Sequence, residues 1–143
     1  MMKKFNWTIH YVSQSGCDIC NDNSNAPYYY DLPCFANIHT HGLDKYNHRE
    51  LCICIDIGHE RVSNILNSIA YSIAYDNLVL EEGICDCILQ GYSTKIISFE
   101  NDPTLYLILP DVNGNFPGEE GCEEIINRQE EYAKYISDNK EYV

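Results

Sequence analysis

The alternation of apolar and polar residues predicts a β-strand near the start of the chain. Phe5, Trp7, Ile9 and Tyr11 alternate with polar residues, which is the period of a strand with one buried face. Short apolar runs bounded by turn-forming residues predict further strands at 35–43, 51–57, 84–89, 94–99 and 104–109. The last two are expected to form a hairpin through Glu100–Pro103.

Two segments have the period of a helix. Apolar residues recur three or four positions apart from His59 to Tyr75, which predicts an amphipathic helix packed on the sheet. A second helix is predicted over 122–137, with Ile125, Gln129, Tyr132 and Ile136 on one face. Acidic residues that complement the helix dipole are expected at its start: Glu119, Glu120, Glu123 and Glu124.

The predicted order of elements is β-loop-β-β-α-β-β-β-α, with short connections between most strands. This order predicts an α+β fold, in which a single antiparallel-rich sheet carries one long helix and a C-terminal helix. The 143 residues, of which 45% are hydrophobic, are expected to form a single domain with its own core. Residues 13–34 are rich in Ser, Asn, Asp and Pro and predict a long irregular loop.

The chain is acidic, with 22 Asp and Glu against 9 Lys and Arg and a net charge of −13. This charge disfavours nucleic acid and anionic membranes as direct ligands and favours a basic protein partner. The N-terminal residues lack the apolar core of a secretion signal, and no apolar run is long enough to span a membrane. A cytoplasmic location with reduced thiols is therefore expected.

Cys17 and Cys20 have the C-x-x-C spacing that lets two thiolates bind one zinc ion. Because no second C-x-x-C is present, the remaining ligands would come from Cys34, His39 or His41. A redox motif and a loop with incidental thiols are the alternatives.

His39 and His41 point to the same side of a predicted strand, and Asp44, His48 and Glu50 follow in the next turn. A His-x-His pair with a carboxylate is a ligand set for a catalytic metal site with an open position. The same pattern is also typical of the polar face of an antiparallel sheet.

Two further cysteine pairs, Cys52/Cys54 and Cys85/Cys87, each place both thiols on one side of a strand. They would bring four sulfurs together only if the two strands were neighbours. The alternative is that these cysteines are small buried side chains beneath a helix.

Tyr28, Tyr29 and Tyr30 lie between two prolines in the 13–34 loop. Tyrosine is enriched at protein–protein hot spots, so this run and the C-terminal acidic residues are candidates for partner binding. The alternative is that the three rings cover the edge of the core.

Several segments together resemble the bacterial domain-of-unknown-function family 4262: Asn37–Leu43, His48–Leu51, Ile65–Asn67, Leu109–Pro117 and Gly121–Cys122. The resemblance covers about Phe35 to Gln129, and Gly118 stands where many relatives have Trp. It implies a small α+β domain of the cytosol and no established activity.

The sequence contains no P-loop, G-x-G-x-x-G, H-E-x-x-H or nucleophile elbow, so catalysis is not the favoured interpretation. The leading hypothesis is a small acidic binding protein, such as an immunity-type protein that neutralises a basic toxin. The alternative is a zinc-binding protein or metal-dependent enzyme that uses the His39/His41 or Cys17/Cys20 cluster.

Overall fold

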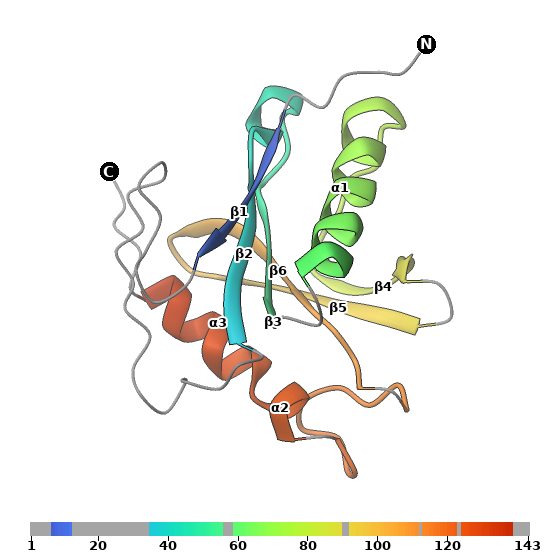
Figure 1. The fold of residues 1–143 in the computed structure, drawn as a ribbon, viewed down its shortest axis with the longest axis vertical. Helices are drawn as coiled ribbons and strands as arrows, with labels where there is room; N and C mark the ends of the chain where they lie inside the picture. The colour runs from blue at the N-terminus through green and yellow to red at the C-terminus, as the bar shows by residue number, and fades with distance from the viewer. Residues whose placement is uncertain are drawn as a thin grey trace.

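The computed structural model describes residues 7–12, 35–55, 59–89, 92–111, 113–122 and 124–138 (Figure 1). The strands are β1 (Thr8–Val12), β2 (Phe35–His41), β3 (Leu51–Ile55), β4 (Gly83–Leu89), β5 (Tyr92–Phe99) and β6 (Asp102–Ile108). The helices are α1 (His59–Tyr75), α2 (Glu124–Asn127) and α3 (Gln129–Asp138), and a 3-10 turn, η2, covers Leu43–Tyr46. The predicted order of elements and the α+β class are confirmed.

The strands form one six-stranded sheet in the order β1-β2-β3-β6-β5-β4. All neighbouring strands are antiparallel except β3 and β6, which run parallel with Leu51 opposite Leu105. After β3 the chain passes through α1 to the far edge of the sheet, and the meander β4–β5–β6 then returns to β3. The sheet is therefore mixed, although antiparallel pairs dominate it as expected.

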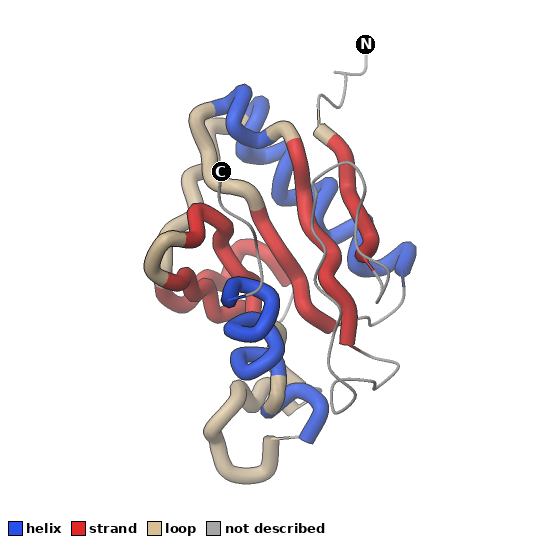
Figure 2. The backbone as a smooth tube through the Cα atoms, turned by 90° about the vertical axis from the view of Figure 1, so that its left-hand side faces the viewer, coloured by secondary structure: helices blue, strands red, loops and turns tan. Residues whose placement is uncertain are grey.

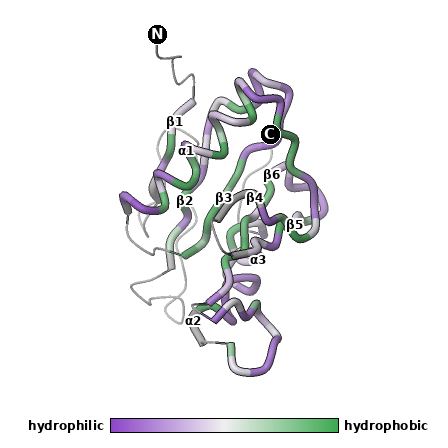
Figure 3. The backbone as a smooth tube through the Cα atoms, turned by 90° about the vertical axis from the view of Figure 1, so that its right-hand side faces the viewer, coloured by the Kyte–Doolittle hydropathy of each residue, from purple (hydrophilic) through white to green (hydrophobic). Residues whose placement is uncertain are grey.

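The two long helices cover opposite faces of the sheet (Figures 1 and 2). α1 packs the predicted stripe onto one face, with Val62, Leu66, Ile69 and Ile73 in the core. The turns of this helix contain both hydrophilic and hydrophobic residues (Figure 3). The core on the other face contains side chains of β3, β6 and α3: Cys52, Cys54, Tyr106, Ile108, Tyr132, Ala133 and Ile136.

The strand cysteines do not form a four-sulfur cluster, because β6 and β5 separate β3 from β4. Cys52 and Cys54 are fully buried in the core beneath α3, which confirms the packing interpretation for this pair. Cys85 packs on the α1 side and is disulfide-bonded, so the expectation of reduced thiols is wrong for this residue.

One continuous C-terminal helix was predicted, but the structure has two helices there: α2 ends at Asn127 and α3 begins at Gln129. The side chain of Gln129 is fully buried at the break, and its Nε2 donates to the Ile126 carbonyl of α2 at 3.2 Å. The same amide exchanges two hydrogen bonds with the backbone of Leu109, just after β6.

Candidate metal centre

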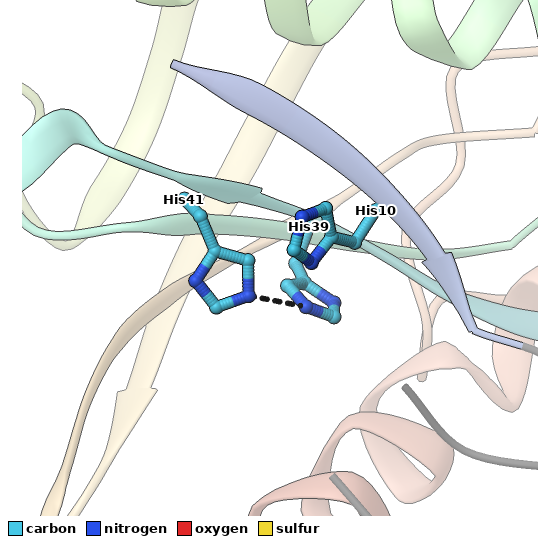
Figure 4. Close-up of side chains that lie close together, drawn as sticks. All are labelled: His10, His39 and His41. Atoms are coloured by element: carbon cyan, nitrogen blue, oxygen red, sulfur yellow. Dashed lines mark hydrogen bonds between the residues drawn. The ribbon is translucent and has the colours of Figure 1, made fainter. Parts of the chain in front are cut away.

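The pairing of β1 with β2 brings three histidines together on one face of the sheet (Figure 4). His10 lies directly opposite His39, and His41 lies two residues further along the same strand. Cross-strand partners point to the same side of a sheet, as do residues two apart on one strand. His39 is also opposite Cys52, which packs beneath α3, so the three imidazoles lie on the α3 side.

The imidazoles are close enough to share one ion. One ring nitrogen from each histidine lies within 4.8 Å of the other two. The Nε2 atoms of His39 and His41 are 3.1 Å apart, and the ring centroids of His10 and His41 are 4.2 Å apart. Two nitrogens bound to one tetrahedral zinc ion at about 2.05 Å are separated by about 3.3 Å. The His39–His41 pair is therefore already near ligand spacing, and His10 requires only a small side-chain movement.

The three rings differ in their surroundings. His39 is buried, with 8% of its surface exposed, whereas His10 and His41 are partly exposed. His39 Nδ1 contacts the Asn37 side-chain oxygen at 2.8 Å, and His10 Nε2 contacts the Thr8 hydroxyl at 3.2 Å. The cluster thus has one anchored ring at the core and two rings nearer solvent, through which an ion could enter.

The structure joins His39 and His41, as predicted, to His10, which the sequence analysis missed. Its position on the polar side of an alternating strand was the only signal in the sequence. The other predicted metal ligands, Cys17, Cys20 and Cys34, lie outside the described residues.

The carboxylate expected near the histidine pair is occupied elsewhere. Glu50 accepts hydrogen bonds from the Thr40 hydroxyl and from the backbone N–H groups of Gly42–Asp44. His48 accepts a bond from the Leu80 N–H at 3.0 Å. Among the described residues, the cluster therefore gains a third imidazole and no carboxylate.

Of the predicted partner-binding residues, the structure describes the side chains of Glu119 and Glu120. Both are exposed in the loop between β6 and α2, ahead of the C-terminal helices. Glu119 also accepts a hydrogen bond from the Phe116 N–H at 3.1 Å. Outside the description are Tyr28, Tyr29, Tyr30 and Glu123, together with the side chain of Glu124.

Two of the segments that carry the family resemblance, a first motif at Asn37–Leu43 and a second at Leu109–Pro117, form turns in the structure. Thr40 and the backbone after it are held by the Glu50 carboxylate. The buried Asp111 accepts bonds from the N–H groups of Asn113 and Asn115, and Gly114 between them has a φ of 84°. A positive φ of this kind favours glycine, so the spacing of the second motif has a structural cause.

Comparison of the chain with family models, with curated proteins and with solved structures gave no match. The resemblance to family 4262 therefore stays a prediction. Among the described residues, no helix has the length and apolar character needed to cross a membrane.

Proposed function

We propose that this chain is a zinc-binding protein whose ligands are His10, His39 and His41. The observation that carries the proposal is the convergence of three imidazoles within 4.8 Å on one face of the sheet. Adjacent strands supply them, and a backbone pairing fixes their relative positions. The alternative for the His-x-His pair, a polar sheet face, explains the His39–His41 hydrogen bond but does not require the third ring.

The ligand chemistry supports a divalent transition metal. Neutral imidazole nitrogen suits zinc, copper, nickel and iron, whereas calcium and magnesium take oxygen ligands. A net charge of −13 also favours cation binding over anion binding. Three protein ligands with an exchangeable fourth is the set found in catalytic zinc sites, so a metal-dependent hydrolytic activity is the enzymatic form of this proposal.

Metal content and affinity test the proposal. The full chain is purified, stripped with a chelator, loaded with Zn²⁺ and dialysed, and zinc is then measured per chain. About one zinc per chain is expected in the wild type and in His48→Gln, a control histidine outside the cluster. Each of His10→Gln, His39→Gln and His41→Gln should lower the zinc affinity at least tenfold.

Two results would refute the metal site. One is less than about 0.1 zinc per wild-type chain after loading, since a structural zinc site does not lose its ion on dialysis. The other is equal zinc affinity in the three cluster variants and the wild type. Circular dichroism of each variant separates loss of ligands from loss of fold.

A second candidate is an acidic, cytoplasmic protein that binds a basic partner, of the immunity type that neutralises a toxin. The −13 charge supports it, together with the exposed Glu119 and Glu120. Such a complex should associate more slowly as salt rises, because screening weakens the steering by opposite charges. Association with a captured basic partner that does not change with salt would count against it.

A further inference from the structure

We infer that Asn37 is a positioning residue of the metal site and fixes His39 as the Nδ1–H tautomer, which presents the Nε2 lone pair to the ion. The inference rests on the proposed metal site and adds a residue that does not itself touch the ion. Three contacts on the α3 side of β2 and β3 carry it.

Asn37 is almost fully buried, with 2% of its surface exposed, so its amide cannot rely on water. Its Oδ1 lies 2.8 Å from His39 Nδ1 and 3.3 Å from the Cys52 Sγ. A thiol is a weak donor and a weaker acceptor. The Cys52 contact therefore orients the amide with its oxygen toward both groups, and an amide oxygen can only accept.

An acceptor at Nδ1 decides where the His39 proton resides. Nδ1–H donates to Asn37, so Nε2 of the neutral ring carries a lone pair. That nitrogen faces the cluster, since it lies 3.1 Å from His41 Nε2. Without metal, His41 Nε2–H donates to it. To bind an ion beside His39, His41 would carry its proton on Nδ1, so that the Nε2 lone pairs of both rings would be available to the ion.

The arrangement corresponds to the outer shell of known metal sites. Histidine ligands almost always donate their second ring N–H to a carboxylate, carbonyl or water, and loss of that partner typically costs 10–100-fold in metal affinity. Here the oxygen belongs to a side-chain amide, which is held in turn by a buried thiol. Asn37 thereby couples the metal site to the core beneath α3.

Nitrogen NMR of the metal-free full chain tests the tautomer directly. Long-range proton–nitrogen spectra at about pH 8, well above the ordinary imidazole pKa of about 6.5, distinguish protonated from unprotonated ring nitrogens. His39 is assigned by comparison with His39→Gln. The wild type should show His39 protonated at Nδ1, and Asn37→Leu, which keeps the branched arrangement of four side-chain heavy atoms and removes the acceptor, should lose this preference.

Zinc affinity, measured by competition with a chromophoric chelator, gives the second readout. Asn37→Leu should bind Zn²⁺ 10–100-fold more weakly, and Asn37→Asp, which keeps an acceptor at the same place, should stay within about threefold of the wild type or bind more tightly. Ile136→Val is the control that disturbs the same core but leaves both the Nδ1 acceptor and the Cys52 thiol that orients it.

Two results would overturn the inference: an Nε2–H tautomer of His39 in the wild type, or a zinc affinity of Asn37→Leu equal to that of Ile136→Val. If Asn37→Leu fails to fold, the wild-type tautomer and the zinc affinity of Asn37→Asp still test the role of Asn37. A wild type that shows the Nδ1–H tautomer but binds no Zn²⁺ would instead refute the proposed function.

Discussion

Replacement of Gln129 by leucine is expected to destabilise the fold more than any exposed change on α3. The Gln129 side chain is fully buried and makes three hydrogen bonds. Oε1 accepts from the Leu109 N–H at 3.0 Å, and Nε2 donates to the carbonyls of Leu109 at 2.6 Å and Ile126 at 3.2 Å. Leucine fills a similar volume but leaves all three backbone groups without this partner.

The magnitude follows from those groups. A buried backbone group that loses its partner costs about 1.5 kcal/mol, so three cost about 4.5 kcal/mol. Burial of the leucine side chain returns about 1.5 kcal/mol. The free energy of unfolding of Gln129→Leu should therefore be about 3 kcal/mol lower than that of the wild type.

Urea unfolding followed by far-ultraviolet circular dichroism measures this difference. With an m-value of about 2 kcal/mol per molar urea, the midpoint should fall by about 1.5 M. Glu131→Gln, at an exposed position of the same helix, is the matched control and should stay within about 0.5 kcal/mol of the wild type. A midpoint for Gln129→Leu that equals that of Glu131→Gln, at the same m-value, would refute the role assigned to the Gln129 amide.

Three further predictions concern the metal, an alkaline transition and a loop. Zn²⁺ at a free concentration of 100 times its dissociation constant should raise the free energy of unfolding of the wild type, measured by urea titration, by about 2.7 kcal/mol. An equal rise in His39→Gln would show that the ion binds elsewhere. Burial and the Asp102 carboxylate, whose Oδ2 accepts from the Tyr106 hydroxyl at 2.5 Å, raise the pKa of Tyr106 well above its ordinary value. The folded state thus keeps a proton that the unfolded state releases, so this part of the stability is present below about pH 10 and is lost as the pH rises further. Between about pH 9 and 11, the free energy of unfolding should therefore fall less steeply with pH in Tyr106→Phe than in the wild type. Identical slopes in the two proteins would contradict the assignment. Glu50→Gln replaces one of the two oxygens that hold Gly42–Asp44 and should lower the free energy of unfolding by about 1 kcal/mol; unchanged thermal unfolding would show that this carboxylate is dispensable.

Local periodicity was sufficient to predict most of the elements. The helix expected from His59 to Tyr75 has these bounds in the structure, because its apolar stripe is read within a few turns. The separation of Leu51, Ile53 and Ile55 from Cys52 and Cys54 also followed from strand alternation alone. Such features depend only on residues that are near one another in sequence.

What the sequence left open depends on contacts between distant residues. The metal cluster needs the register that sets His10 opposite His39, and nothing within either strand specifies that register. At the helix break, the Gln129 side chain bonds to the backbone of Leu109, which lies 20 residues earlier in the chain. The sequence also does not show that Glu50, one of the two carboxylates that follow the histidine pair, bonds to Thr40 and Gly42, because these contacts form only in the folded chain.

The parallel pair at the centre of the sheet has a consequence for how the chain folds. On one side of it lie β1, β2 and β3, and on the other the meander β4–β5–β6, so each half is built from its own antiparallel pairs. Leu51 and Leu105 meet only after the 53 residues between them form a loop, at an entropic cost of about 3.5 kcal/mol. Contacts of such long range slow folding, so the pairing of β3 with β6 should form late, after each half has paired its own strands. All three histidines belong to the first half, and an ion bound there would cross-link the edge strand β1 to β2 before the two halves join.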